Sequence, residues 1–282
     1  MIGTRRITRR SFLAAAGLTA AALALTACGG SASSTASSTA SSAASSEAAS
    51  TSAAAELTTV EAGKLTMATN ATFPPYEMTT DAGTIEGIDV DTAQAIAEKL
   101  GLELQIDDMD FDAALLSVQQ GKADIAMAGI TVTDERMAVM SFSDSYATGI
   151  QSVIVPEGSD IASVDDLAGK KIGTQRGTTG YLYCSDDFGE DAVVAYDNGL
   201  TAVQALNNGQ VDAVVIDNEP AKAYVESNPG LKILDTSYAE ENYAIGMNKS
   251  NTALLEAVNA ALEELKADGT LQSIVDKYIT AE

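Results

Sequence analysis

Residues 128–136, which read AGITVTDER, place a glycine, two threonines and an arginine between an expected strand and an expected helix. The expected strand is the short, mostly apolar run 123–127. Thr131 and Thr133 are suitable N-cap residues for the helix that follows. Free backbone N–H groups at a helix start, with the Arg136 guanidinium within one turn, form a site for a carboxylate. A small zwitterion needs such a site at one end and a carboxylate for its ammonium group at the other.

A later part of the chain repeats the pattern of this region. Residues 114–130 read ALLSVQQGKADIAMAGI, and residues 202–218 read AVQALNNGQVDAVVIDN. The motif Gly-x-x-Asp begins at Gly121 in the first copy and at Gly209 in the second, with an apolar helix expected before it and an apolar strand after it. The repeat predicts two similar α/β lobes, although chance α/β patterning is the alternative.

Each copy ends at a residue that could hold one pole of a ligand. The expected strand ends at Gly129 in the first copy and at Asp217 in the second, and a weaker similarity links residues 64–70 with 171–177. Ligands in such sheets bind beyond the carboxyl ends of the strands. Two lobes that face each other would therefore place Arg136 and Asp217 across one cleft.

Residues 1–28 predict an export signal, which is not part of the fold. Residues 9–13, RRSFL, follow a twin-arginine pattern, and the apolar run 12–27 is short for a membrane span. The sequence LTAC at 25–28 matches the lipoprotein processing box, in which Cys28 becomes the lipidated N-terminus. An uncleaved membrane anchor is the alternative. In both cases the rest of the chain would lie at the outer face of the cytoplasmic membrane, on the extracellular or periplasmic side.

The next segment, residues 29–56, is almost entirely Ser, Ala and Thr after its first glycines. It has no apolar periodicity with which to bury a core, so we expect a flexible tether. About 225 residues remain, enough for one large domain or two modest ones. Because the last two helices most simply pack on the first lobe, the chain would cross between lobes twice, as a hinge requires. We expect lobe 1 at 57–147 plus 245–282, lobe 2 at 151–240, and the hinge near 146–150 and 239–243.

Composition excludes several classes of function. After Cys28 the chain carries 12 basic and 40 acidic residues, a formal charge of −28, which argues against nucleic acid and anionic lipid as partners. The chain has no histidine, which excludes Ser-His-Asp and Cys-His catalysis and the usual zinc sites. Cys184 is the only cysteine left after lipidation, so no internal disulfide is possible.

A cation site built from carboxylates needs separate consideration. Asp89 and Asp91 are similar to the start of a calcium loop, but the pattern then fails, because Ala93 and Gln94 stand at its fifth and sixth positions. We instead expect Asp91 to cap a helix that begins near Thr92. We expect neither a metal nor a cofactor.

The rest of the pattern predicts alternating strands and helices. The expected strands are 65–68, 102–106, 123–127, 153–155, one that ends at Gln175, and 243–247. The expected helices are one that ends at Leu100, followed by 113–120, 252–265 and 271–278. Phe111 is expected on a loop, and the glycine-rich loop 175–180 would expose backbone N–H donors.

Several segments together resemble the type II periplasmic binding proteins of the polar amino-acid uptake family, the solute-binding components of ABC importers. The motifs that carry the resemblance, in order, are ATNATFPPYE, GIDVD, DFDAALLSVQQGKADIAMAGITVTDER, FSDSYATG, DLAGKKIGTQRGTTG and VDAVVID. The likeness runs from about Leu65 to Tyr278. It implies an α/β fold of two lobes, joined by a two-strand hinge, that close on one free amino acid.

The resemblance assigns roles to residues at both poles of such a ligand. Arg136 would clamp the α-carboxylate, assisted by the backbone N–H groups of Thr131 and Thr179. Asp217 would receive the α-ammonium group, assisted by the Gly129 carbonyl and the Thr131 hydroxyl. Without the family, Arg136 would be read as a surface ion pair, and Asp217 and the two threonines as helix caps.

The resemblance also assigns residues around the ligand side chain. Phe73 and Phe111 would form aromatic walls, which suit an aliphatic stem or a cation. Many family members carry an acidic residue where this chain has Asn70, which both donates and accepts hydrogen bonds. This departure argues against lysine or ornithine and leaves glutamine, other neutral polar amino acids and arginine open. Arg176 could admit an acidic side chain, but a solvated surface arginine is the simpler interpretation.

These observations lead to one main interpretation and two alternatives. The main one is a monomeric, lipid-anchored receptor that binds a free polar L-amino acid by lobe closure and delivers it to the permease of an ABC importer, without catalysis. One alternative is a sensor that presents its ligand to a membrane receptor. The other is a dehydratase or lyase on the same fold, with Glu77 or Glu219 proposed as the general acid.

Overall fold

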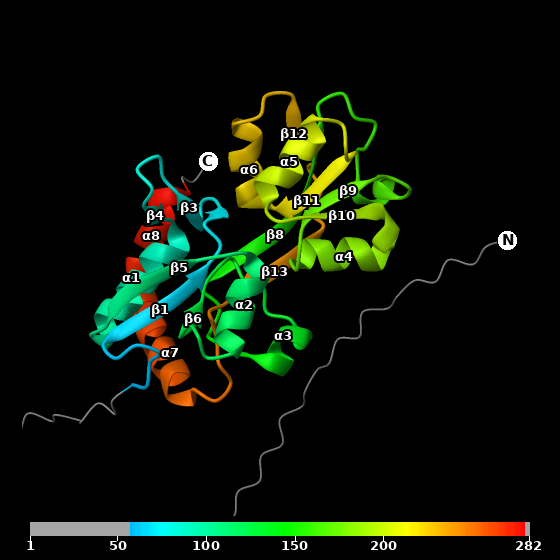
Figure 1. The fold of residues 1–282 in the computed structure, drawn as a ribbon. Coiled ribbons are helices and arrows are strands. Elements are labelled where there is room, and N and C mark those ends of the chain that lie inside the picture. Colours follow the sequence, from blue (N-terminus) through cyan, green and yellow to red (C-terminus); the bar gives the residue numbers. More distant parts are fainter. Residues whose placement is uncertain (1–56, 280–282) are drawn as a thin grey trace, which may run out of the picture. The chain divides into compact units, whose positions relative to one another are not determined.

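The computed structural model describes residues 57–279. The expected export signal at 1–28, with Cys28, and the expected tether at 29–56 lie outside the described residues. Between residues 57 and 279, no helix is both long and apolar enough to cross a bilayer. The described chain forms two main sheets with helices packed on them, each of which defines one lobe, and one small three-stranded sheet (Figure 1).

The sheet of lobe 1 has the strand order β5-β1-β6-β14-β7. Its strands are β1 (Lys64–Thr69), β5 (Glu103–Asp108), β6 (Ile125–Ala126), β7 (Ser141–Phe142) and β14 (Gly246–Met247). Strand β1 runs parallel to β5 and β6, whereas β14 runs antiparallel to β6 and β7. A small antiparallel sheet of β2 (Thr72–Phe73), β3 (Glu77–Thr79) and β4 (Ile85–Glu86) follows β1. The helices of lobe 1 are α1 (Ile88–Leu100), α2 (Phe111–Gln119), α3 (Asp134–Val139), α7 (Thr252–Ala267) and α8 (Thr270–Tyr278).

The sheet of lobe 2 has the order β10-β9-β11-β8-β12, and β13 pairs with another part of β8. Its strands are β8 (Ala147–Pro156), β9 (Ile172–Gln175), β10 (Val193–Tyr196), β11 (Ala213–Asp217), β12 (Leu231–Ile233) and β13 (Ala239–Tyr243). Its α-helices are α4 (Thr179–Phe188), α5 (Gly199–Asn207) and α6 (Asn218–Glu226), and short 3-10 helices cover Val164–Leu167 and Glu190–Ala192. As in lobe 1, the central strands β9, β10 and β11 are parallel.

Two adjacent strands carry the chain between the lobes. Strand β8 enters lobe 2, and β13 returns beside it in antiparallel register from Ala239 opposite Gln151 to Tyr243 opposite Ala147 (Figure 1). Both strands pass through the segments that the sequence predicts as the hinge. Flexion at these segments stays a prediction.

The last two helices pack on elements of lobe 1. Helix α7 buries an apolar stripe at Leu254, Val258 and Leu262, which are spaced by one helical turn. Helices α7 and α8 both contact α1. The C-terminal end of the described chain therefore belongs to lobe 1, although β8 to β13 separate it from the rest of that lobe in sequence.

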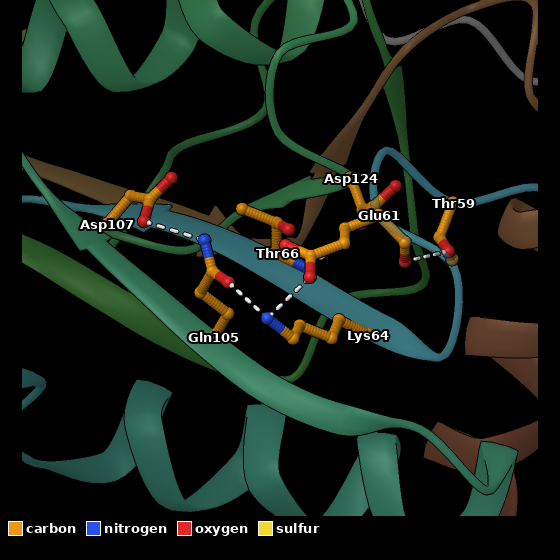
Figure 2. Close-up of polar contacts among 7 residues, drawn as sticks. All are labelled: Thr59, Glu61, Lys64, Thr66, Gln105, Asp107 and Asp124. Carbon is orange, nitrogen blue, oxygen red and sulfur yellow. Dashed lines mark hydrogen bonds and ion pairs between the residues drawn. The ribbon is translucent and has the colours of Figure 1, made fainter.

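The repeated Gly-x-x-Asp motif has the same structural role in both lobes. Gly121 follows α2 with φ 67°, and Gly209 follows α5 with φ 66°, so both glycines end a helix in the left-handed region. Asp124 then accepts the backbone N–H of Thr66 at 2.8 Å, at the start of β1 (Figure 2). In the second copy, Asp212 accepts the backbone N–H of Lys171 at 2.8 Å, immediately before β9.

The start of β1 is fixed by further polar contacts. Asp124 also accepts the backbone N–H of Val60 at 2.8 Å, so its two oxygens hold two segments of backbone. Lys64 lies beside this point, with Nζ 2.6 Å from Glu61 Oε1 and 3.2 Å from Gln105 Oε1 (Figure 2). These contacts hold the start of β1 against neighbouring segments of lobe 1.

Replacing Asp124 with alanine is expected to lower the free energy of unfolding by about 1–3 kcal/mol, because the buried Thr66 N–H loses its acceptor. Urea denaturation of the two proteins measures the difference. The exposed Asp81 provides the matched control, and Asp81→Ala is expected to change stability by less than about 0.5 kcal/mol. Equal effects of the two substitutions would contradict this role for Asp124.

Three local predictions are wrong. The helix expected from about Thr92 begins at Ile88, after the N-cap residue Gly87, because the Asp91 N–H already bonds to the Gly87 carbonyl at 2.9 Å in helical geometry. Asp91 therefore does not cap it, and its carboxylate instead accepts from Lys277 at 2.7 Å.

Phe111 is the first residue of α2 and not part of a loop, since Asp110 supplies the extended N-cap conformation. The strand expected at 243–247 is divided between two sheets. Strand β13 ends at Tyr243 in lobe 2, and β14 begins at Gly246 in lobe 1. The residues between them pair with other segments, as in the bond from Ala244 N–H to the Ile130 carbonyl at 3.0 Å.

Candidate functional site

One pocket collects residues from the carboxyl ends of the central strands of both sheets. Asn70 follows β1, Ala128 follows β6, Gln175 ends β9 and Asp217 ends β11. All eight residues predicted to bind a ligand line this pocket, namely Asn70, Phe73, Phe111, Gly129, Thr131, Arg136, Thr179 and Asp217. Its other lining residues are Glu77, Ala128, Gln175 and Thr178. The empty space among the lining atoms, open solvent included, is about 310 Å³.

Arg136 supplies a buried positive charge to the pocket. Thr133 caps helix α3 by accepting the Arg136 backbone N–H at 3.2 Å, which fixes the residue at the start of the helix. The guanidinium donates to the Thr131 carbonyl at 2.7 Å and to the Gly177 carbonyl of lobe 2 at 3.1 Å. It also lies 5.3 Å from the centre of the Phe111 ring.

Arg136 is not the surface ion pair that its sequence context allows. It is 9% exposed, and no carboxylate among residues 57–279 forms an ion pair with it. Burial lowers the pKa of this guanidinium, although nearby acidic groups oppose the change. A buried guanidinium with free donors is a strong site for a carboxylate, which it can bind in bidentate geometry.

Asp217 supplies a buried carboxylate from lobe 2. It occupies the N-cap position of α6, yet its side chain makes no capping hydrogen bond. Its Oδ2 accepts Gln151 Nε2 at 2.8 Å, and its Oδ1 accepts the Tyr243 hydroxyl. Burial raises the pKa of Asp217 to about 7, and the negative charge of Glu241 contributes to the increase. A cationic ligand group would offset both effects.

Glu241 connects the Asp217 region to lobe 1. This buried glutamate on β13 accepts Gln151 Nε2 at 3.0 Å and the Thr131 hydroxyl at 3.0 Å. The Thr131 hydroxyl thus donates its hydrogen to Glu241, which leaves its oxygen lone pairs able to accept from a ligand. Neither Glu241 nor Gln151 was identified from the sequence, because β8 and β13 meet only in the folded chain.

The backbone around the pocket is held in conformations that bring it close to a ligand. Gly129 has φ +54°, and a Cβ atom there would lie 2.7 Å from the Phe73 ring. Only glycine fits this position without a shift of the aromatic wall. Thr179 is the first residue of α4, where helix N–H groups have no intrahelical acceptor, and Thr178 caps the helix by accepting the Tyr181 N–H at 3.3 Å.

Glu77 is the main lining residue that sequence reasoning failed to place in a binding role. It is completely buried on β3, opposite Phe73 in the β2–β3 pair. Neither of its carboxyl oxygens has a hydrogen-bond partner among the described residues. Burial raises the pKa of Glu77 well above its usual value, and Asp89 raises it further. One feature of the sequence could have placed Glu77 beside the pocket. It lies four residues after Phe73 across a tight turn, so the two residues fall on adjacent strands.

A neutral amide pair completes the pocket. Asn70 Oδ1 accepts Gln175 Nε2 at 3.0 Å across the two lobes, and Asn70 Nδ2 donates to the Met109 carbonyl at 2.9 Å. Gln175 Oε1 is buried and has no donor among the described residues. The pocket therefore has unused acceptor atoms on Gln175 and Glu77.

Two other predicted features lie outside this pocket. Arg176 is a solvated surface residue with a side chain 58% exposed, 3.8 Å from Asp197. Cys184 is buried in the core of lobe 2. Within residues 57–279, no cluster of three or more Asp, Glu or Cys side chains is arranged to hold a metal ion.

A pocket between two similar α/β lobes, with a buried guanidinium and a buried carboxylate, defines a two-lobed solute-binding protein. Residues 65–281 match the family described as bacterial extracellular solute-binding proteins, family 3, and the chain belongs to that family. The resemblance predicted from the sequence motifs, and the type II fold of two α/β lobes, are confirmed.

Related proteins are described as binding amino acids. A probable histidine-binding protein of Neisseria gonorrhoeae is 32% identical, with 95% of each chain covered. A solved ancestral arginine-binding protein bound to arginine is 43% identical with a TM-score of 0.74, covering 77% of this chain and 98% of that one. A solved ancestral arginine-binding protein bound to glutamine is 42% identical with a TM-score of 0.73, covering 78% of this chain and 99% of that one. The chain is accordingly a solute-binding protein of this family, and its relatives are named for binding amino acids, in one case as part of an ABC transporter.

Proposed function

We propose that the pocket binds a free amino acid with a cationic side chain, and that arginine is its preferred ligand. The charges that line the pocket support this choice. Arg136 is the only basic residue in the lining, whereas Asp217 and Glu77 are both acidic. A ligand that matches them carries one carboxylate and two cationic groups.

The unpartnered acceptors favour a guanidinium over an ammonium group. Both oxygens of Glu77, together with Gln175 Oε1, lack donors. A guanidinium has five N–H donors in one plane and can bond a carboxylate and an amide oxygen at once. Its flat face also suits aromatic walls such as Phe73 and Phe111. The buried Glu77 carboxyl group is the observation on which this proposal rests.

The α-amino and α-carboxylate groups would be held as the resemblance implies. Arg136 would clamp the carboxylate, assisted by the backbone N–H groups of Thr131 and Thr179. Asp217 would receive the ammonium group, together with the Gly129 carbonyl and the Thr131 hydroxyl. Asn70 would act indirectly by holding Gln175, which differs from the direct contact expected from the sequence.

Closure of the lobes would complete the site. The bonds from Arg136 to Gly177 and from Gln175 to Asn70 both join lobe 1 to lobe 2 beside the pocket. A ligand that touches both lobes would stabilise this arrangement over an open one. We propose lobe 1 at 57–147 plus 245–282, lobe 2 at 151–240, and flexion near 146–150 and 239–243.

The cellular context completes the proposal. Cys28 would carry a lipid anchor at the outer face of the cytoplasmic membrane, and residues 29–56 would tether the binding protein to it. The protein would act as a monomer that binds its ligand without turnover and passes it to the permease subunits. The LTAC sequence at 25–28 supports the anchor.

Thermal unfolding of the full chain with each common amino acid tests the ligand. Arginine at about 100 times its dissociation constant is expected to raise the Tm by about 5–10 °C. Lysine and glutamine are expected to raise the Tm less than arginine does, and glutamate is expected not to raise it. A larger shift with glutamine than with arginine at neutral pH would overturn the preference for a cationic side chain.

Ligand affinity is expected to decrease as the pH is lowered, because Asp217 becomes protonated. The carboxylate must be ionised to accept an ammonium group, and its pKa in the structure is about 7. Below this pH the ligand must displace a proton, so affinity for any amino acid would drop about tenfold per pH unit. Calorimetric titration with glutamine, whose side chain does not titrate, measures the effect. A constant affinity between about pH 5 and pH 8 would contradict it.

A further inference from the structure

A second carboxyl group lies behind Glu77 and outside the pocket lining. Asp89, on the first turn of α1, is completely buried. Its Oδ2 accepts the Gly129 backbone N–H at 3.0 Å, and the Tyr146 hydroxyl and the Glu77 carboxyl group lie beside its carboxylate. The Asp89 N–H bonds to the carbonyl of Tyr76, the residue before Glu77, which keeps the two acidic residues together.

Two buried carboxyl groups side by side cannot both remain ionised without a cation. Each ionised group has lost its hydration, and the two charges repel each other. No lysine or arginine among residues 57–279 forms an ion pair with Glu77 or Asp89. One proton must therefore be shared by the pair while no ligand cation is present.

The environment of each group decides which one keeps the proton. Asp89 accepts a backbone N–H and stands at the positive end of the α1 dipole, so its ionised form is stabilised. Glu77 has no such donor. In agreement, burial raises the pKa of Asp89 only to about 6, whereas it raises the pKa of Glu77 well above its usual value.

The other groups that face Glu77 act in the same direction. They are Asp108 at the end of β5, Asp217 on β11, and the tyrosines Tyr76, Tyr146 and Tyr224. The acidic members would disfavour ionisation of Glu77, and all three tyrosines are neutral at ordinary pH.

We infer that Asp89 keeps Glu77 protonated in the empty pocket, so that a cationic ligand side chain enters in exchange for that proton. The inference rests on the proposed function, since it concerns the group assigned to the ligand side chain. Asp89 is then a positioning residue for ligand choice, because it acts through Glu77 and Gly129 without touching the ligand. A neutral amide side chain could enter without the exchange, by bonding to the protonated carboxyl group.

The exchange predicts different pH dependences for arginine and glutamine. Both ligands release the proton of Asp217, but only arginine also releases that of Glu77. The ratio of arginine affinity to glutamine affinity is therefore expected to fall about tenfold for each unit of pH decrease while Glu77 holds its proton. Titration calorimetry of the full chain in detergent, at physiological salt and in two buffers of different ionisation enthalpy, measures both the affinities and the protons released.

Glu77→Gln separates this local exchange from the general charge of the protein. The ratio of affinities is expected to become independent of pH in this variant, although the rest of the acidic surface is unchanged. A ratio that changes equally with pH in the variant and the parent would overturn the inference.

Asp89→Asn tests the part played by Asp89. The amide oxygen can still accept the Gly129 N–H, while the negative charge beside Glu77 is lost. The pH at which the ratio begins to fall is expected to move down by about one unit, because a like charge has been removed. Asp81→Asn, which removes an exposed charge from the same lobe, is the control and is expected to leave that pH unchanged. An unchanged pH in Asp89→Asn would overturn the role of Asp89.

The parent protein alone distinguishes the inference from the proposed function. If arginine binds but its affinity relative to glutamine is constant between about pH 5 and pH 8, the exchange is wrong and the arginine site stands. If arginine does not bind at all while glutamine does, the proposed cationic ligand is wrong. If Asp89→Asn is too unstable to study, the parent and Glu77→Gln still decide whether the proton is exchanged.

Discussion

Replacing Arg136 with alanine is expected to weaken amino-acid binding by about a hundredfold to a thousandfold. The ligand carboxylate would lose both donors of a buried, bidentate contact, and truncating one member of a buried charge pair costs about 2–5 kcal/mol. The bond from Arg136 to Gly177 would also be lost, which removes a contact between the lobes. Titration calorimetry with arginine measures the loss directly.

Two further variants test whether the loss of binding is specific to the Arg136 guanidinium. Arg136→Lys keeps the positive charge but not the planar pair of donors, so an intermediate loss is expected. Arg176→Ala removes an arginine that is 58% exposed and, within the described part of the chain, is paired only with Asp197, and it is expected to change affinity less than about threefold. A loss in Arg136→Ala no greater than that in Arg176→Ala would show that Arg136 does not hold the ligand carboxylate.

The part of the site around Arg136 could be predicted from the sequence because its residues lie close together in the chain. Thr131, Thr133 and Arg136 lie within six residues, so one helix start determines their relative positions. The position of Asp217 could be predicted for a similar reason, since the internal repeat placed it at the end of an equivalent strand. These residues, from both lobes, line one pocket.

The other parts of the site depend on contacts between distant segments. Asp217 is held by Gln151 and Tyr243, which come from β8 and β13. The interaction of Glu77 with Asp89 requires the small sheet β2–β3–β4 to fold against the start of α1. The charge of the pocket is therefore a property of the folded chain, and the sequence left glutamine, other neutral polar amino acids and arginine open.

The wrong local predictions have the same origin. Phe111 follows a strand and precedes a clear helical pattern, but whether it belongs to the loop or the helix depends on the Asp110 backbone. Likewise, residues 243–247 form a continuous apolar run, although the chain changes sheets within it. Periodicity detects burial in both cases, and it does not report which sheet buries the residue.

Replacing Glu77 with glutamine is expected to separate binding of arginine from binding of glutamine. The variant keeps the size of the side chain and removes the only carboxyl group that the pocket offers to a ligand side chain, Asp217 being assigned to the α-ammonium group. Arginine affinity at neutral pH is expected to fall about tenfold to a hundredfold, as for loss of a charged hydrogen bond worth about 1.5–3 kcal/mol. Glutamine affinity is expected to change less than about threefold, because a neutral amide can bond to either form of residue 77.

The comparison of the two ligands also controls for damage to the fold. A distorted pocket would weaken both ligands equally, since both would use Arg136 and Asp217 to hold the α-carboxylate and α-ammonium groups. Glu98→Gln removes an exposed carboxylate from α1 and is expected to leave both affinities unchanged. Equal losses for arginine and glutamine in Glu77→Gln would assign Glu77 a structural role only, and an undiminished arginine affinity would place the ligand side chain elsewhere. A selective loss of arginine would identify the buried carboxyl group on β3 as the residue that sets ligand charge.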